Sequence, residues 1–156
     1  RSVSRGLGDV YKRQMLVCVQ GTEEGELCGE IYSCYLKDPI WFRGVGDLVL
    51  KLDEMCNWVG MPHATTDPRF LNLETERRYR EASSHHPQAD RSNLTYTMDQ
   101  IPFKQALKAR EVLIVYVKYR QFSSLQGSIR GKITKGKVVN FRSALELMRM
   151  ISMIQL

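Results

Sequence analysis

The stretch Gly29–Met55, GEIYSCYLKDPIWFRGVGDLVLKLDEM, has a counterpart near the end of the chain, Gly127–Ile154, GSIRGKITKGKVVNFRSALELMRMISMI. The first parts of the two stretches align at an offset of 98 residues, and after a one-residue slip the rest align at an offset of 99. Internal similarity of this kind indicates a repeated structural unit. We predict two copies of a β-hairpin–helix unit. The alternative is chance similarity between two strand–turn–strand–helix segments.

The first unit has the pattern of two short strands and a helix. Apolar residues alternate in part along 27–36, as in a half-exposed strand. The Lys-Asp-Pro sequence at 37–39 predicts a turn, and Ile40–Phe42 predicts a return strand. Apolar residues then recur at helical spacing, namely Val45, Leu48, Val49, Leu52, Met55, Cys56 and Val59. Gly60 and Pro62 predict the end of this helix.

The second unit repeats this order. Val112–Gln121 predicts a strong strand, for which Met15–Val19 is the candidate equivalent in the first unit. Lys135-Gly136 predicts a two-residue hairpin turn, after which Val138–Phe141 returns. Ser143 and Glu146 have the spacing of a capping box, in which each side chain bonds the backbone N–H of the other residue. One helix face follows, formed by Ala144, Leu147, Met148, Ile151 and Ile154.

These units predict one α+β domain, an antiparallel sheet built from two β-hairpin–helix units with both helices packed on one face. The halves span 15–73 and 107–156. The polar segment 74–106 between them lacks a steady apolar period, so we expect a mobile linker or long loop with a short helical turn near 74–82. The second face of the sheet carries tyrosines and charged residues, and we expect it to be open to water.

Residues 1–14, RSVSRGLGDVYKRQ, fit no secondary-structure period. Asp9–Gln14 can be back-translated as GAT GTG TAT AAG AGA CAG, which resembles the mosaic end of the transposon adapters used for sequencing libraries. We therefore interpret 1–14 as a translated adapter from a metagenomic assembly and leave it out of the fold prediction. A disordered basic leader and a signal peptide are the alternatives, although a signal peptide requires an apolar run that this stretch lacks. On this interpretation Met15 need not be the native start.

Charge divides the chain into two parts. The net charge is +6 overall, and residues 1–14 contribute +3 of it. Residues 15–100 carry a net charge of −6 and residues 101–156 a net charge of +9. The two halves can therefore pair within one fold, or the basic half can face an anionic partner. Four cysteines lie in apolar or alternating segments without C-x-x-C spacing, which favours a reduced, cytoplasmic protein. No apolar run approaches the length of a membrane span.

The stretch around Tyr119-Arg120-Gln121, Gln126-Gly127 and Phe141-Arg142-Ser143 resembles an uncharacterised family of small bacterial proteins. That family's pattern runs strand, Y-R-Q-N-A-T-W-Q-G, hairpin, F-R-S-x-x-E-L and helix. The present chain departs from it at 122–125, where the Asn and Trp are missing. The piece WVGMPHATTDPRF after the first predicted helix is also similar, with His63 in place of Gln. The resemblance covers 27–72 and 112–154 and implies no known activity.

Motifs for catalysis are weak throughout the chain. We find no G-x-S-x-G elbow, no G-x-G-x-x-G and no phosphate loop. His85-His86 near Asp90 has no rigid ligand framework, and a turn histidine bonded to local backbone is the favoured interpretation of His63 beside Asp67. We therefore predict no catalytic residues, no metal site and no cofactor, although an enzyme with an unconventional site is a third alternative.

The basic second half gives the main functional lead. Lys118, Arg120, Arg130, Lys132 and Lys135 lie on adjacent predicted strands. If they share a face with Tyr116 and Phe122, they can contact phosphates and stack bases. A solvated face, or one neutralised by the acidic half, is the alternative that we favour. The Phe-Arg pairs Phe42-Arg43 and Phe141-Arg142 are candidate partner contacts, or else a core Phe and an Arg that covers apolar surface.

From these observations we predict a small, non-enzymatic, cytoplasmic binding or interaction module of unknown partner. A protein partner or a second copy of the chain is compatible with it, and no membrane contact is expected. The alternative function is nucleic-acid binding through the basic half.

Overall fold

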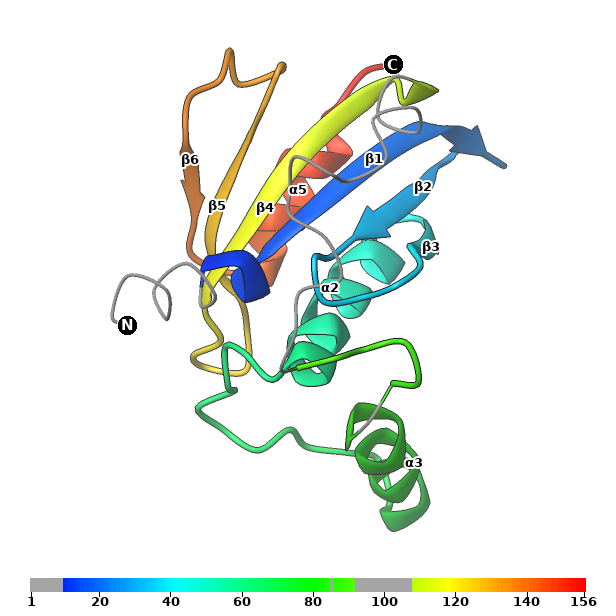
Figure 1. Cartoon of the computed structure of the whole chain (residues 1–156), viewed down its shortest axis with the longest axis vertical. Helices are drawn as coiled ribbons and strands as arrows, with labels where there is room; N and C mark the ends of the chain where they lie inside the picture. The colour runs from blue at the N-terminus through cyan, green and yellow to red at the C-terminus, as the bar shows by residue number, and fades with distance from the viewer. Residues whose placement is uncertain (1–9, 85, 92–107) are drawn as a thin grey trace.

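The chain folds around one sheet of six antiparallel strands. The computed structural model describes residues 10–84, 86–91 and 108–156. Its elements are β1 (Gln14–Glu23), β2 (Glu26–Tyr32), β3 (Ile40–Arg43), α2 (Val45–Val59), α3 (Leu73–Ser84), β4 (Glu111–Tyr119), β5 (Gln126–Gly131), β6 (Val139–Phe141) and α5 (Ala144–Ser152). The strand order is β3-β2-β1-β4-β5-β6 (Figure 1). The predicted α+β class with an antiparallel sheet is confirmed.

The two halves pair their strands in the same register. Val17 pairs with Ile31, and their equivalents at an offset of 98, Val115 and Ile129, pair in the same way. A β-bulge follows Val19 in β1 and Val117 in β4, so even the irregularity is repeated. Leu16 pairs with its own equivalent, Ile114, across the centre of the sheet. An approximate two-fold axis therefore passes between β1 and β4 and relates the two units.

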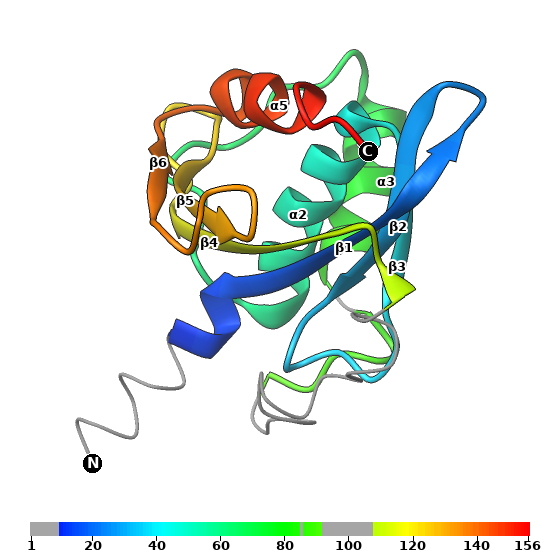
Figure 2. The same cartoon turned by 90° about the horizontal axis from the view of Figure 1, so that it is seen from above.

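Both helices pack on one face of this sheet (Figure 2). Leu48 and Leu52 of α2 and Leu147 and Ile151 of α5 are fully buried. They join one core cluster with alternate strand residues, namely Met15, Val17, Val19, Ile31, Phe42, Leu113, Val115, Val117, Ile129 and Phe141. Burial of one such side chain stabilises the fold by about 1.5–3 kcal/mol. Equivalent positions of the two units thus build the same core.

Carboxylates at the start of both helices hold the chain that enters them. The Ser143 Oγ accepts a hydrogen bond from the Glu146 backbone N–H at 3.1 Å, as predicted. The Glu146 carboxylate, however, accepts from the N–H of Arg142 at 3.0 Å, one residue before the cap, so this half of the predicted capping box is wrong. Asp47 accepts from the N–H of Arg43 at the same distance of 3.0 Å. This carboxylate-to-backbone hydrogen bond occurs in both units and holds the connection between the strand and the helix in place.

The connection between β5 and β6 is longer than a two-residue hairpin. Lys135 and Gly136 have positive φ angles of 55° and 75°, as the predicted turn requires, but the strands end at Gly131 and restart at Val139. The Gly131 N–H donates to the Thr134 hydroxyl and the Gly136 N–H to the Gly131 carbonyl, both within 3.0 Å. These local bonds take the place of strand-to-strand hydrogen bonds between β5 and β6. The connection is therefore longer than two residues, and the predicted two-residue turn is wrong.

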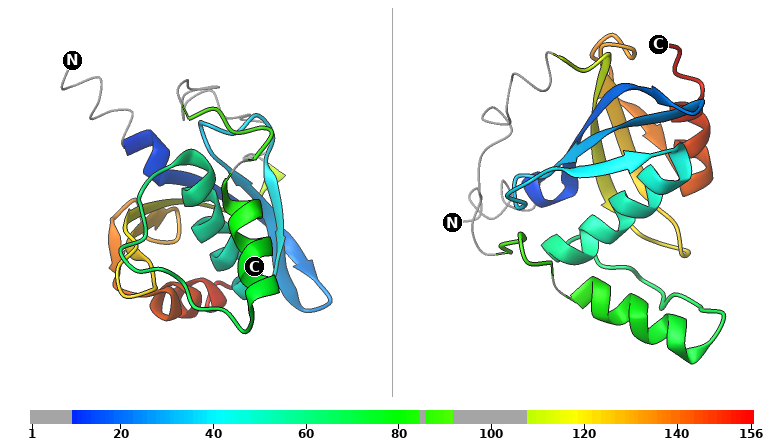
Figure 3. Two further views of the ribbon diagram at one scale, coloured as in Figure 1. Left: turned by 90° about the horizontal axis from the view of Figure 1, so that it is seen from below. Right: turned by 90° about the vertical axis from the view of Figure 1, so that its right-hand side faces the viewer.

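Part of the predicted linker is a regular helix. α3 covers Leu73–Ser84, where we expected only a short helical turn. It lies on the side of α2 away from the sheet (Figure 3). The Trp58 indole N–H donates to the Ala82 carbonyl at 2.9 Å, and the Ser83 hydroxyl donates to Glu54 at 2.7 Å. Of the predicted linker 74–106, residue 85 and residues 92–106 lie outside the described residues.

The second face of the sheet is closed at its centre. Leu16, Cys18 and Tyr32 are buried there and form a cluster with half-buried Val112 and Ile114. The predicted water-open face is therefore wrong for this central patch. Within the described ranges, no helix has the length and apolar character needed to cross a membrane.

Two buried thiols, Cys18 and Cys56, are expected to make the protein less stable at alkaline pH. Burial raises the pKa of Cys56 from 9.0 to about 12, and burial together with the Glu30 carboxylate raises the pKa of Cys18 to about 11. Because the folded values lie above the unfolded one, this contribution is complete below pH 9.0 and is lost as pH rises through the folded values. We expect the free energy of unfolding to fall above this pH, by up to about 1.4 kcal/mol per pH unit for each thiol.

Urea unfolding between pH 7 and pH 10 measures this loss. Ionisation of other side chains affects both proteins alike, so the informative quantity is the difference in slope between the wild type and Cys56→Ala. The variant should lose stability less steeply above pH 9.0. Identical slopes in the two proteins would contradict the assignment.

Candidate functional site

The symmetry of the fold breaks at one pair of connections. Segments 22–27 and 120–125 have the same length and occupy equivalent places, each beginning just after the β-bulge of its strand. The first continues as a tight hairpin, with Glu24 and Gly25 at positive φ. The second leaves the sheet as a loop, with Phe122 and Ser123 at positive φ. The Gln126 side chain closes this loop by bonding both the N–H and the carbonyl of Gln121.

A buried arginine anchors the loop to the helix layer. The side chain of Arg120 is only 4% exposed. Its Nε donates to the Pro62 carbonyl at 2.7 Å, and its Nη1 donates to the Asp53 carboxylate at 3.2 Å and to the Asp53 carbonyl at 3.3 Å. The Thr65 N–H in turn donates to the Arg120 carbonyl at 3.0 Å. Arg120 thus joins the loop, α2 and the segment after α2.

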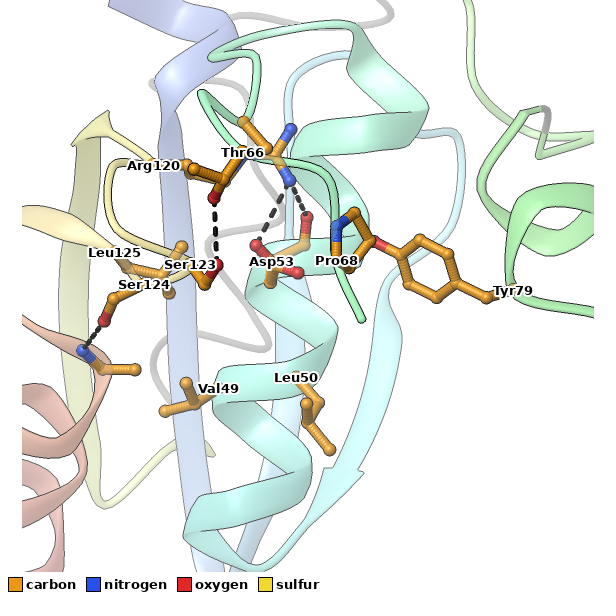
Figure 4. Close-up of a pocket in the computed structure, with 12 residues that line it drawn as sticks. Val49, Leu50, Asp53, Thr66, Pro68, Tyr79, Arg120, Ser123, Ser124 and Leu125 are labelled. Carbon is orange, nitrogen blue, oxygen red and sulfur yellow. Dashed lines mark hydrogen bonds and ion pairs between the residues drawn. The ribbon is translucent and has the colours of Figure 1, made fainter. Parts of the chain in front are cut away.

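A cavity of about 170 Å³ lies between these parts (Figure 4). Its apolar wall comes from α2, from the loop and from the first turn of α5, through Val49, Leu50, Leu125 and Ala144. Its polar groups come from Asp53, Thr66, Tyr79, Arg120, Ser123 and Ser124. Such a mixture of apolar wall and few convergent polar groups is typical of small-molecule sites.

A second hollow of about 380 Å³ adjoins the first and is more polar. The two share Ala64, Thr66, Pro68, Tyr79 and Arg120 as lining residues. The second hollow adds residues of α3 and of the chain beyond it, together with His63, Asp67 and Arg91. The shared residues make the two hollows neighbouring parts of one site.

Several hydroxyl groups of the site accept a protein hydrogen bond and keep their own hydrogen. The Ser124 oxygen accepts from the Ala144 N–H at 2.7 Å. The Tyr79 oxygen accepts from the Asn57 amide at 3.0 Å. Thr66 and Ser123 bond each other at 2.9 Å, so one of their two hydrogens is used. The site therefore offers hydrogen-bond donors to a bound molecule.

The structure disperses the five basic residues of the predicted nucleic-acid face. Lys118 lies at the end of β4, Arg130 in β5, and Lys132 and Lys135 in the connection after β5. Arg120 is buried beside Asp53 on the helix side and does not share a surface with the others. Phe122, which we considered as a stacking residue, is 85% exposed in the loop.

In the described ranges, the acidic half forms an ion pair with one of these five basic residues, Arg120, through Asp53. Among the described residues, no carboxylate lies within ion-pair distance of Arg130, Lys132 or Lys135. Three acidic side chains of the first half have other partners: Glu24 and Glu26 pair with Arg43, and Glu30 accepts from Gln20 and Tyr32.

The two Phe-Arg pairs divide between core and surface. Phe42 and Phe141 are buried in the core cluster. The Arg43 side chain is paired with acidic residues of its own half, and the Arg142 side chain is 89% exposed beside Glu146. The two arginines therefore do not present matching contact points.

The structure describes two of the three histidines, His63 and His86. His63 is exposed at the second hollow, and His86 accepts from the Gln88 N–H and lies with its ring 4.4 Å from that of Trp58. His85 lies outside the described residues. In the described ranges no group of three His, Cys, Asp or Glu side chains is placed to hold a metal ion.

No known protein family, no curated protein and no solved structure matches this chain in comparisons of sequence and fold. The resemblance to the Y-R-Q family therefore stays a prediction. The geometry nevertheless gives physical roles to the residues that carry the resemblance. Gln126 closes the loop, Ser143 caps α5, and Arg120 holds the loop against α2.

Proposed function

We propose that this protein is a small, non-enzymatic binding module whose ligand occupies the cavity between α2 and the loop 120–125. The observation that carries the proposal is the break in symmetry. Two segments of equal length follow the same bulge, but 22–27 stays in a hairpin of the sheet, whereas 120–125 leaves the sheet and borders a cavity. Loops held by a rigid scaffold are common places for binding residues. We further expect the protein to act in the cytoplasm, where its four free, buried cysteines stay reduced.

The size of the cavity limits the ligand group that enters it. An apolar protein cavity of about 150 Å³ binds benzene. The present cavity, at about 170 Å³, therefore suits one aromatic ring or a short branched alkyl group with a small polar substituent. A larger ligand extends into the neighbouring hollow.

Benzyl alcohol is a suitable neutral probe. Titration of the ¹⁵N-labelled protein should shift the amide signals of Val49, Ser124 and Leu125 in a saturable manner. Ala144→Leu fills the cavity from the first turn of α5 and should abolish these shifts. Leu145→Ala, a change at the neighbouring exposed residue that does not line the cavity, should leave them unchanged. Shifts that do not saturate, or that persist in Ala144→Leu, contradict the proposal.

A second candidate function is nucleic-acid binding, and one observation favours it. Arg130, Lys132, Lys135 and Lys137 lie in β5 and the connection after it, without a carboxylate of the described residues in ion-pair range. Unpaired basic side chains on adjacent structure can contact phosphates. Arg120 takes no part in this version of the hypothesis.

Binding to a mixed-sequence oligonucleotide across a salt series tests this second function. Affinity should be measurable at low salt and fall as salt rises. Lys132→Gln/Lys135→Gln should weaken it more than Lys37→Gln/Arg78→Gln, which removes the same charge elsewhere. No binding at low salt, or no difference between the two double variants, would overturn it.

A further inference from the structure

Arg120 has one nitrogen that the protein leaves for another partner. Its Nε and Nη1 are bonded to Pro62 and Asp53, whereas its Nη2 makes no hydrogen bond to the described residues. Among the described residues, the Nε of Arg13 is the one fully buried side-chain N or O atom that has no hydrogen-bond partner. The Nη2 of Arg120 is therefore not a fully buried atom without a partner, and the Arg120 side chain lines both hollows.

Arg91 stands in a similar position on the second hollow. Its Nε donates to the Trp58 carbonyl at 2.9 Å, and its Nη2 donates to the carbonyls of Asn57 and Ser84. These bonds hold the guanidinium at the end of α2, and they leave Nη1 without a hydrogen bond to the described residues. No carboxylate of that part of the chain lies within ion-pair distance of Arg91.

Of the three arginines that line the second hollow, Arg91 forms no ion pair with a described residue. Arg80, which also lines it, is paired with Glu76. Arg120 shares its charge with Asp53, and Asp67 is the carboxylate that faces the hollow with Arg91. Asp67 and Arg91 are both exposed, so water screens the charges of both, whereas the Arg120 side chain is buried. Guanidinium groups with free N–H donors in such a place bind carboxylates and phosphates strongly.

The first hollow adds an apolar requirement. Its wall of Val49, Leu50, Leu125 and Ala144 excludes a bare inorganic ion as the best ligand, because it would leave that wall empty. Tyr79 lines both hollows and has a hydroxyl hydrogen to donate. A molecule that spans the site thus needs an apolar body at one end and an acceptor group at the other.

We propose that the ligand is a small organic anion, with its apolar body in the cavity beside Leu125 and its carboxylate or phosphate on the free guanidinium nitrogens of Arg120 and Arg91. This assignment rests on the proposed function of the cavity and specifies the ligand class. A hydrogen bond from a charged donor contributes about 1.5–3 kcal/mol, which corresponds to about tenfold or more in affinity.

The test compares ring-bearing probes that differ in charge. Benzoate and phenyl phosphate are expected to bind at least about tenfold more tightly than benzyl alcohol, and benzylammonium more weakly. Whichever of the two anions binds more tightly identifies the acid group. If benzyl alcohol binds in the cavity but the anions bind no better, the anion assignment fails while the proposed function stands. If no probe shifts the cavity amides, both fail.

Arg91→Gln is the decisive variant, because Arg91 is exposed and its loss leaves the Arg120 anchor in place. It should lower benzoate affinity about tenfold and leave benzyl alcohol affinity unchanged. Arg78→Gln, on an exposed position of α3 that lines neither hollow, is the matched control and should change neither value. Equal benzoate affinities in the two variants would overturn the role of Arg91. Arg120→Lys, which keeps the charge but loses the planar fork, should also weaken benzoate binding if it folds.

Discussion

Replacing Gly127 by alanine is expected to lower the free energy of unfolding by about 3 kcal/mol, at the upper end of the usual cost of overpacking. A Cβ at this position would lie 1.8 Å from the Tyr116 carbonyl oxygen and 3.1 Å from the Phe141 ring. The oxygen belongs to the neighbouring strand and cannot move without breaking the β4–β5 ladder. Gly29, the equivalent glycine, has the Cys18 carbonyl oxygen at 1.9 Å, so Gly29→Ala should have a similar effect.

Gly21→Ala is the matched control. Gly21 lies at the bulge of β1, but a Cβ there has no neighbouring atom within 4 Å. Alanine has a smaller unfolded-state entropy than glycine, so this variant should be as stable as the wild type or slightly more so. Urea unfolding of the three variants at pH 7 gives the comparison. Gly127→Ala with the stability of Gly21→Ala would show that the bulge does not need its glycine.

These glycines also explain why the repeat was visible in the sequence. A bulge that brings one strand's carbonyl against the next strand requires glycine there, and the helix stripes require Leu or Ile at fixed spacing. Gly29, Leu48 and Leu52 therefore recur as Gly127, Leu147 and Ile151. Local and core requirements of this kind act through residue type and spacing, so they could be predicted from one chain.

α3 could not be predicted in full because little in its own sequence requires a helix. None of its residues is buried, so it has no apolar stripe. Its stability comes from ion pairs one turn apart, Glu76–Arg80 and Arg77–Glu81, and from contacts to Trp58 and Glu54 on α2. The contacts to Trp58 and Glu54 depend on how the chain folds back onto α2, and the spacing of apolar residues in the sequence does not show this.

The place of Arg120 was missed for a geometric reason. Strict alternation along the strand puts residue 120 on the same side as 116 and 118, which is the outer face. The bulge between Val117 and Tyr119 adds one residue and reverses the alternation beyond it, so that Arg120 points to the helix layer. The signal that could have found it lies in the repeat, because 120–125 differs in composition from 22–27 at equal length.

Asp53→Ala is expected to lower the free energy of unfolding by about 3 kcal/mol, because it leaves a buried guanidinium without its counter-charge. We take the lower end of the range for broken buried pairs, since the Asp53 side chain is 35% exposed whereas that of Arg120 is 4% exposed. The variant also tests whether Arg120 binds a ligand or only stabilises the fold. Nη1 of Arg120 then has only the residue 53 carbonyl as acceptor, so benzoate should stabilise the variant more than it stabilises the wild type.

The double variant Asp53→Ala/Arg120→Met decides whether the cost arises from the unpaired charge. Methionine fills the space of the arginine stem without a charge, so the double variant should be more stable than the sum of the single effects predicts, by about 1 kcal/mol or more. Urea unfolding of the wild type, both single variants and the double variant at low and high salt completes the cycle. The coupling should change little with salt, because the Arg120 charge is buried and salt screens it weakly. Strictly additive losses would mean that Asp53 and Arg120 stabilise the fold independently, and the loop 120–125 would then need another anchor than this ion pair.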